Sequence, residues 1–387
     1  MLITRLELKN WRNFRTVDVA LRERVYVIGP NASGKSNLLD VLRFLRDMAN
    51  PEGGGLRKAV KDRGGIAKLR CLQTRRDPEI QVAVELAERV DAEPMWRYTL
   101  CFRSEGKGQQ RPVVGVERVE NLERGKLLVD RPNEQDQADP ERLTQTFLEQ
   151  INTNRDFRPV AEFFAGITYL HLVPQLLKYA DQLGGYRLEH DPFGQAFLER
   201  IAKTPEKTRA ARLKKINEVL RVCVPNLSEL RLVHDEISGA PHLEALFEHW
   251  RPAAGWQRED QFSDGTLRLL GILWSLLEGD SLLLLEEPEL SLNEDIVRQI
   301  HPLLWRMQRQ AKYRRQVFVT THSEALLQER SIDPREVIRL EPTTEGSEVR
   351  VASEQDRELI AAGYSVAEAL LPQVRPARVE QLALFRP

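Results

Sequence analysis

The stretch GPNASGKS, residues 29–36, follows directly on the apolar run VYVI at 25–28. It fits the pattern G-x-x-x-x-G-K-[ST], in which backbone N–H groups and a helix N-terminus point at phosphate. The pattern requires a strand before the loop and a helix after it. After the loop, apolar residues recur at helical spacing: Leu38, Val41, Leu42, Leu45 and Met48. The sequence therefore predicts an α/β fold of the P-loop NTPase type.

The loop residues have distinct expected roles. Gly29 and Gly34 permit the tight turn, Lys35 reaches the β and γ phosphates of ATP, and the Ser36 hydroxyl ligates Mg²⁺. The alternative is an ordinary turn before a helix. We expect the nucleotide contacts to come from the loop and the residue after it: Gly29, Asn31, Ala32, Ser33, Gly34, Lys35, Ser36 and Asn37.

A second candidate site is LLLLEEPE, residues 282–289. Four apolar residues suit a strand buried on both faces of a parallel sheet, and its two carboxylates lie at the carboxyl end, where such sheets bind ligands. Glu286 is expected to hold Mg²⁺ and Glu287 to act as the general base on the attacking water. The alternative is two solvent-facing acids that end a core strand.

Two further segments follow in an informative order. QFSDGTLRLL, residues 261–270, places Ser263, Asp264 and Gly265 before an amphipathic helix, an arrangement also expected of an ordinary helix cap. The strand VFVTT is followed by His322, as a sensor of the γ-phosphate would be, although a histidine after a strand is often structural. The order of loop, Ser-x-Gly helix, carboxylate strand and histidine favours the functional interpretation.

Composition limits the function classes. The 387 residues carry a net charge of −1, with 41% apolar and 30% charged residues, so a nucleic acid or membrane partner would have to meet a local patch. The longest apolar run, SLLLL, is far shorter than the roughly 20 residues that span a bilayer. The three cysteines are well separated, which indicates reduced thiols in a cytoplasmic protein and no zinc site.

The chain is expected to fall into four segments. Residues 1–135 form an N-terminal lobe with the phosphate loop and a strand meander, and 136–250 form a mainly helical insertion. Residues 251–371 form a C-terminal lobe, with helices at 266–279 and 294–308 and strands at 281–285 and 316–321. Residues 372–387 form a flexible, proline-punctuated tail.

These motifs together resemble the ABC-type ATPase heads of the SMC/RecF/OLD group, in particular bacterial ATPases with a single RecF-like head. The matching parts span residues 1–340: ITRLELKNWRNF, GPNASGKSNLLD, QFSDGTLR, LLLLEEPELSL and TTHS. The resemblance implies that two heads sandwich ATP, with Mg²⁺ as cofactor. It adds Arg12 to the nucleotide contacts, lets Ser263, Asp264 and Gly265 act in trans, and places Asn293 toward the partner head.

The sequence departs from the group's pattern in three places. FSDGT replaces the LSGGQ of transporter heads, Glu286 replaces the usual aspartate, and Gln73 is only a weak candidate for a Q-loop. These departures bear on the rate of hydrolysis rather than on binding. OLD proteins also carry a nuclease domain, for which this chain stops too soon, so we expect any nuclease to be a separate subunit.

Two basic clusters are candidate contacts with the DNA backbone. The first lies at residues 57–76 and the second at 306–315, and each is otherwise explained as a solvated charged face. The basic helix TRAARLKK, residues 208–215, is interpreted as such a face. The DNA candidates are Arg57, Lys58, Lys61, Arg63, Arg75, Arg76, Arg309, Lys312, Arg314 and Arg315.

The tail carries QLALF, in which Gln381, Leu382, Leu384 and Phe385 resemble the pentapeptide that docks bacterial polymerases and repair proteins on the DNA sliding clamp. The alternative is a tail that folds back on its own head.

The sequence as a whole favours an ATPase homodimer that gates a DNA-directed process, in repair or anti-phage defence, with a separate effector. The ATPase subunit of an ABC transporter and a small-metabolite phosphotransferase are the alternatives.

Overall fold

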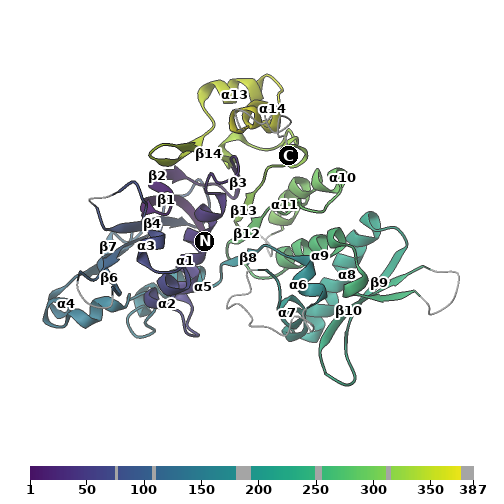
Figure 1. Cartoon of the computed structure of the whole chain (residues 1–387), viewed down its shortest axis with the longest axis horizontal. Helices are drawn as coiled ribbons and strands as arrows, with labels where there is room; N and C mark the ends of the chain where they lie inside the picture. The colour runs from purple at the N-terminus through teal and green to yellow at the C-terminus, as the bar shows by residue number, and fades with distance from the viewer. Residues whose placement is uncertain (75–76, 107–109, 180–192, 249–254, 311–314, 376–387) are drawn as a thin grey trace, which may run out of the picture. The chain divides into compact units, whose positions relative to one another are not determined.

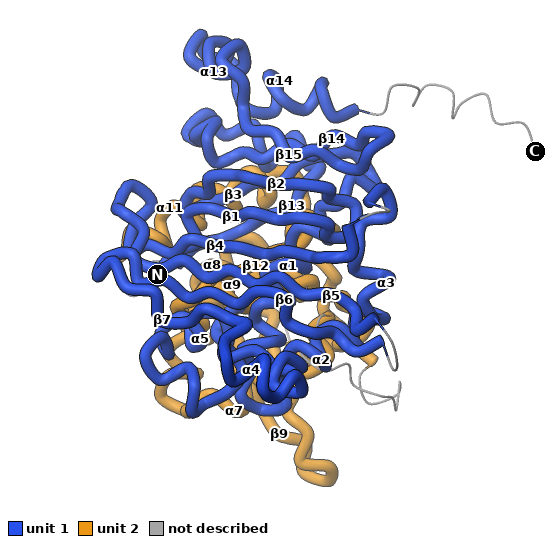
Figure 2. The backbone as a smooth tube through the Cα atoms, turned by 90° about the vertical axis from the view of Figure 1, so that its left-hand side faces the viewer, with its two compact units in different colours: residues 1–167, 315–387 blue, residues 168–314 orange. Residues whose placement is uncertain are grey.

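The computed structural model describes residues 1–74, 77–106, 110–179, 193–248, 255–310 and 315–375 (Figure 1). It divides into two compact units (Figure 2). Unit 1 consists of residues 1–167 and 315–387, and unit 2 of residues 168–314. Within the described residues, no helix combines the length and the apolar character that crossing a membrane requires.

Unit 1 contains a six-stranded antiparallel sheet in the order β2-β1-β4-β5-β6-β7. Alternating side chains of its strands are buried, as the period of a strand with one covered face requires. Phe44 of helix α1 stacks on Phe102 of this sheet and meets the Trp11 ring edge-on. The strands are β1 (Leu2–Trp11), β2 (Phe14–Ala20), β4 (Ile80–Ala87), β5 (Trp96–Ser104), β6 (Pro112–Asn121) and β7 (Lys126–Arg131).

A second group of strands in unit 1 runs β15-β14-β3-β13. Strand β3 (Arg24–Ile28) is parallel to both β13 (Val317–Thr320) and β14 (Val337–Thr343), and β15 (Gly346–Val351) is antiparallel to β14. Six residues separate β3 from helix α1 (Lys35–Ala49), which is buried over most of its length. This is the strand, loop and helix that the sequence predicts.

Shorter helices complete unit 1. The α-helices are α2 (Leu56–Asp62), α3 (Ile66–Leu69), α4 (Glu134–Ala138), α5 (Arg158–Ala165), α12 (Glu324–Leu327), α13 (Glu354–Ala361) and α14 (Val366–Leu370). The 3₁₀ turns are η1 (Pro140–Thr144), η2 (Arg155–Phe157), η5 (Pro334–Glu336) and η6 (Leu371–Val374).

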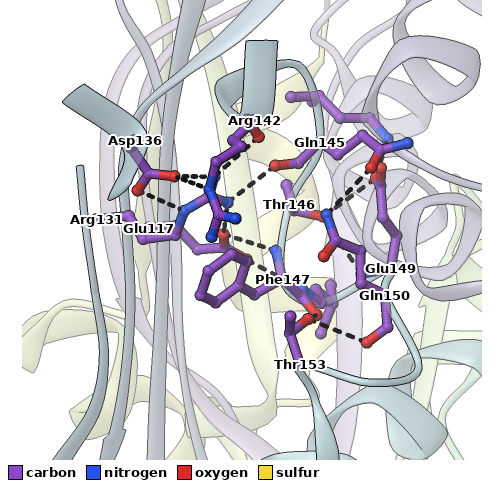
Figure 3. A network of polar contacts seen from close by, with 12 residues as sticks. Glu117, Arg131, Asp136, Arg142, Gln145, Thr146, Phe147, Glu149, Gln150 and Thr153 are labelled. Carbon is purple, nitrogen blue, oxygen red and sulfur yellow. Dashed lines mark hydrogen bonds and ion pairs between the residues drawn. The ribbon is translucent and has the colours of Figure 1, made fainter. Parts of the chain in front are cut away.

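A buried ionic network fixes the segment after β7 against the antiparallel sheet (Figure 3). Arg131 forms ion pairs of 2.9 Å with both Glu117 and Asp136, and none of these three side chains is exposed. Its guanidinium also lies 4.0 Å from the ring centroid of Phe147. Glu117 in turn accepts from the backbone N–H groups of Phe147 and Leu148. Because a buried ion pair is costly unless its partners are fully bonded, these contacts hold residues 142–150 in one conformation.

Unit 2 combines a parallel strand pair with a small antiparallel sheet. Strands β8 (Thr168–Leu170) and β12 (Leu283–Glu286) are parallel, and the antiparallel strands β9 (Leu227–His234), β10 (Pro241–Phe247) and β11 (Trp256–Arg258) run in the order β11-β10-β9. The helices are α6 (Pro174–Lys178), α7 (Phe197–Lys203), α8 (Glu206–Cys223), α9 (Asp264–Leu277), α10 (Glu294–Val297) and α11 (Ile300–Gln308), with the 3₁₀ turn η3 (Glu259–Gln261).

The α/β fold class is confirmed, and two local expectations need correction. The helix expected over 294–308 is broken into α10 and α11. Pro302 explains the break, because its ring clashes with the carbonyl of Arg298 in a continuous helix. The segment 136–250, expected to be mainly helical, also contains β8, β9 and β10. The boundaries of the four predicted segments stay a prediction.

Candidate functional site

The phosphate loop of unit 1 lies at the carboxyl ends of three parallel strands. Thr320 of β13 is level with Val27 of β3, and the Thr321 N–H donates to the Val27 carbonyl over 3.2 Å. On the other side, Arg339 of β14 is level with Ile28. The residue after β3 is Gly29, so the loop begins where α/β sheets bind their ligands.

The loop backbone has the shape of an anion cradle. Ala32 and Gly34 have positive φ angles of 64° and 100°. A Cβ atom on Gly29 would lie 2.9 Å from the Leu340 carbonyl oxygen, so only glycine fits there. No side chain caps the N-terminus of α1, and the buried Ser33 hydroxyl has no hydrogen-bond partner among the described residues. These features fit a bound phosphate group.

Lys35 is the charged group of the cradle. Its side chain is buried, and its Nζ donates to the carbonyl oxygens of Gly29 (3.1 Å) and Pro30 (3.3 Å). The ammonium group is therefore held across the mouth of the loop, between the two residues that open it. Asn31, by contrast, is exposed. This placement suits the role that the sequence predicts for Lys35, which stays a prediction.

A residue that the sequence analysis missed, Asn13, holds the loop from outside. Its Nδ2 donates to the Ser33 carbonyl (2.9 Å) and to the Ser347 hydroxyl (2.7 Å), and its Oδ1 accepts from Asn37 Nδ2 (2.8 Å). The Trp11 indole N–H donates to the Asn37 carbonyl over 3.1 Å. The turn after β1, the loop, α1 and β15 are thus joined through one amide. In the sequence, Asn13 is the second asparagine of NWRNF and directly follows Arg12, the residue expected to contact the nucleotide.

Arg12 itself makes a different contact from the one expected. Its Nε and Nη2 both donate to Asp40 Oδ2, at 3.0 and 2.7 Å. Arg63 contacts the same carboxylate. The guanidinium is therefore engaged with α1, and the role of Arg12 as a nucleotide contact stays a prediction.

His322 lies at the same sheet edge as the loop. It directly follows Thr320 and Thr321, which are fully buried, whereas His322 is exposed. The next residue, Ser323, caps α12 through the Leu326 N–H. Because β13 and β3 end side by side, the chain places His322 next to the opening of the phosphate loop, where a γ-phosphate sensor would stand.

In unit 2, the two predicted carboxylates end β12. Residues 282–285 are fully buried, and Glu286 Oε2 accepts a hydrogen bond from the Tyr169 hydroxyl of the adjacent β8. His171 Nδ1 lies 3.4 Å from the Glu286 carbonyl oxygen. Glu287 has a φ of 44°, uncommon outside glycine, which turns the chain sharply away from the strand. Strained backbone of this kind is concentrated at functional sites.

The predicted signature segment begins α9. Ser263 is exposed and caps the helix, since its Oγ accepts from the Thr266 N–H over 3.1 Å. Asp264 accepts hydrogen bonds of 2.7 Å from Gln175 and from Lys178. A Cβ atom on Gly265 would clash with the Ser291 carbonyl oxygen, so Gly265 packs on the turn that follows β12. The signature helix and the carboxylate strand are therefore joined within unit 2.

Arg268 lies one turn into α9, near three carboxylates. Burial lowers the pKa of its guanidinium, and the charges of Asp264, Glu287 and Glu289 act in the opposite direction. Its Nε has no hydrogen-bond partner among the described residues. A cation thus stands near the predicted base Glu287, a feature that the sequence motifs did not reveal. Asn293 caps α10 through the Asp295 N–H and is exposed.

The candidate DNA contacts differ in exposure and in pairing. The Arg63 side chain is only 6% exposed and is paired with Asp40 and Asp47, and Arg315 is 2% exposed, so neither can reach a DNA backbone. Both predictions are wrong, because these two arginines are buried inside the protein. Lys58 is paired with Asp62, whereas Arg57, Lys61 and Arg309 are exposed. Several predicted contacts lie outside the described residues: Arg75, Arg76, Lys312, Arg314, Gln381, Leu382, Leu384 and Phe385.

Comparison with protein families gives one match that covers most of the chain. A family model described as "AAA domain, putative AbiEii toxin, Type IV TA system" matches residues 25–328. This range contains the phosphate loop, the signature segment, the carboxylate strand and His322.

Two curated relatives carry the description "DNA replication and repair protein RecF". The protein of Roseiflexus castenholzii is 32% identical over 101 residues, which are 24% of this chain and 26% of the relative. The protein of Oceanobacillus iheyensis is 33% identical over 93 residues, 23% of this chain and 24% of the relative. The alignments thus span about a quarter of these relatives.

Among solved structures, an SMC head bound to the C-winged helix domain of ScpA has a TM-score of 0.54 at 16% identity, covering 92% of this chain and all of that chain. An SMC head with an extended coiled coil, bound to the C-terminal domain of ScpA derived from Pyrococcus furiosus, has a TM-score of 0.50 at 15% identity, covering 93% and 98%. At this identity the likeness shows the P-loop NTPase fold.

Proposed function

Because the chain belongs to the AAA-domain family that matches residues 25–328 and is an ATP hydrolase of the SMC/RecF type, we propose that it works as a head that pairs with a second copy around ATP and gates a DNA-directed process. The family supplies the nucleotide and the ATPase class. The pairing, the metal and the DNA-directed role are the proposal.

The nucleotide would be held by the loop of unit 1. The N–H groups of residues 31–36 and the N-terminus of α1 bind the phosphates, and Lys35 moves from the Gly29 and Pro30 carbonyls to phosphate oxygens. Ser36 and Glu286 would hold Mg²⁺, which supplies charge neutralisation on the phosphates when bound. Both are oxygen donors of the kind that Mg²⁺ prefers.

Glu287 is the proposed general base. Its carboxylate follows the metal candidate Glu286 on a sharply turned backbone, so it can accept a proton from water while Glu286 remains bonded to Tyr169. His322, exposed at the edge of the loop, is proposed to contact the γ-phosphate.

The exposure of Ser263 at the N-terminus of α9 is the main support for the pairing of two copies around ATP. This helix is 14 residues long, and its N-terminus presents partial positive charge that favours phosphate. A second copy can therefore offer Ser263, Asp264 and Gly265 to the nucleotide held by the first. Asn293, exposed at the start of α10, would face the same partner.

The DNA-directed role rests on the relatives and on surface charge. Two relatives are described as replication and repair proteins, and exposed cations remain at Arg57, Lys61 and Arg309. Repair or anti-phage defence, a separate effector such as a nuclease, and a sliding clamp contact through the tail are all part of this proposal. The transporter alternative finds no support among the RecF and SMC relatives reported above.

The direct test of nucleotide use compares the wild-type chain with Lys35→Ala. The proposal expects the wild type to bind and turn over ATP with Mg²⁺, and expects the variant to lose both while keeping its melting temperature. ATP binding that survives Lys35→Ala unchanged would contradict the assigned site.

A further inference from the structure

Helix α8 (Glu206–Cys223) of unit 2, labelled in Figure 1, is rich in basic residues. Its 18 residues include six basic and two acidic side chains, which gives six minus two, or +4. The whole chain carries −1. A local field of this sign in a chain of balanced charge attracts anionic partners.

The inner face of α8 is fixed by packing. Leu213, Ile216 and Leu220 are buried, and the helix contacts β9 and α9. Arg212 stacks over the Trp274 ring at 5.2 Å, and Arg209 Nη1 donates to the Ala202 carbonyl over 2.9 Å. Two of the six basic residues therefore anchor the helix, and the remaining charge is presented outward.

The outer face has a regular row of cations. Lys207, Lys214 and Arg221 are each seven residues apart, so they lie on one face at intervals of about 10 Å. All three are exposed and form no ion pair or hydrogen bond with the described residues. Exposed Lys203, at the end of α7, precedes the row, and Glu218 is its one acidic member. Cations without internal partners are available to an external anion.

The two clusters that the sequence favoured each lose part of their charge to internal contacts. Arg63 and Arg315 are buried, and Lys58 is paired with Asp62. In the first cluster the exposed cations Arg57, Lys61 and Lys68 lie on the two short helices α2 and α3, whereas the cations of α8 follow one face of a single helix at regular spacing.

We propose that the outer face of α8, defined by Lys207, Lys214 and Arg221, binds the phosphate backbone of DNA. This inference rests on the proposed DNA-directed function and names the surface that serves it. Contacts from lysine and arginine to phosphate are independent of sequence and sensitive to salt. An anionic membrane is a less suitable partner, because a helix that lies in a membrane interface needs a large apolar face. The exposed apolar residues near this row are Val222 and small alanines.

The test uses the full-length chain and the triple variant Lys207→Ala, Lys214→Ala, Arg221→Ala. Alanine keeps the helix propensity, so folding is preserved, and melting temperature and ATP turnover serve as checks. Binding to a fluorescein-labelled duplex of arbitrary sequence is measured by anisotropy over a series of KCl concentrations. The expected result is a loss of affinity of at least about tenfold at low salt. The slope of log K against log[KCl] should fall by about 2 to 3, since each phosphate contact contributes about 0.9.

Two matched variants sharpen the result. Glu218→Gln removes the acid from the same face and should tighten binding, while Arg124→Ala with Lys126→Ala, two exposed cations outside the candidate clusters, should leave the salt slope near that of the wild type. If the wild type binds no DNA at any salt concentration, the proposed DNA role and this inference both fail. If the wild type binds and the α8 triple variant keeps its affinity and slope, the inference alone is overturned. It is likewise overturned if the triple variant loses binding only to anionic phospholipid vesicles.

Discussion

The Asn13 side chain donates a hydrogen bond of 2.9 Å to the carbonyl oxygen of Ser33, inside the phosphate loop. The same amide bonds Ser347, which lies 334 residues further along the chain, and accepts from Asn37 at the start of α1. The loop's conformation therefore depends on residues at both ends of the sequence. A cradle held in this way is preorganised for phosphate, which saves the free energy of ordering it on binding.

The first prediction concerns this amide. Asn13→Ala leaves Asn37, Ser347 and the Ser33 carbonyl without their partner, and each lost hydrogen bond is worth about 1 kcal/mol. ATP affinity should fall about tenfold or more, measured with a fluorescent ATP analogue. Ser347→Ala is the control, because it removes a single bond and should have a smaller effect. An unchanged nucleotide affinity in a folded Asn13→Ala protein would show that the loop holds its shape unaided.

A second prediction separates two members of the first basic cluster. Arg63 is buried between Asp40 and Asp47, whereas Arg57, six residues earlier, is exposed. Arg63→Ala should lower the free energy of unfolding by about 2 to 3 kcal/mol, the lower end for a broken buried pair because Arg12 and Arg46 still contact the two carboxylates. Arg57→Ala should change it by less than about 0.5 kcal/mol. Urea unfolding of both variants gives the comparison, and equal stabilities would refute the internal role of Arg63.

The third prediction concerns pH and Glu149. This carboxylate accepts from the Leu56 N–H over 2.7 Å at the start of α2 and from the Thr146 hydroxyl over 3.1 Å (Figure 3). Burial raises the pKa of Glu149 to about 7 from an ordinary value of 4.5, and the Glu117 carboxylate adds to the rise.

The sign follows from proton binding. Between pH 4.5 and about 7 the folded chain keeps a proton that the unfolded chain releases, so Glu149 makes the fold less stable as the pH rises through this window. Glu149→Gln stays neutral and keeps an acceptor oxygen. Above about pH 7 the variant should be more stable than the wild type, by up to about 3 kcal/mol, and this difference should vanish below pH 4.5. Melting curves of the two proteins across this range test it, and a difference independent of pH would contradict the assignment.

The fourth prediction concerns Glu287. Glu287→Gln keeps the shape of the side chain but cannot accept a proton from water, so turnover should fall by at least about 10²-fold while ATP binding persists. Light scattering after gel filtration should then show an ATP-dependent dimer that accumulates. Wild-type turnover in this variant would remove Glu287 from the role of base.

Sequence predicted the parts of the site whose signals are local. The loop at 29–36, the buried strand that ends in Glu286 and the strand before His322 are each recognisable within about ten residues, because loop chemistry and burial leave a pattern there. The same is true of α9, whose cap Ser263 and apolar spacing are both visible in the sequence.

The misses arise from tertiary contacts. Asn13 acquires its role by bonding a residue 334 positions away, which no local pattern contains. From the sequence alone, Arg63 and Arg315 are expected on the surface. The sequence does not show that Asp40 and Asp47 lie beside Arg63, or that Arg315 is buried. The sequence predicts a helical segment where β9 and β10 lie, because the strong helical signal of α8 directly precedes them.

The central claim is that one ATP is held by two copies, the first supplying Lys35 and the second Ser263. The most direct measurement mixes two inactive variants, Lys35→Ala, which lacks the cradle, and Ser263→Arg, which lacks the lid. A mixed dimer contains one intact composite site, formed by the loop of the Ser263→Arg copy and the α9 N-terminus of the Lys35→Ala copy. The account predicts that ATP turnover, absent from each variant alone, appears on mixing. A mixture that stays inactive, or a Ser263→Arg protein that turns over ATP alone, would contradict it.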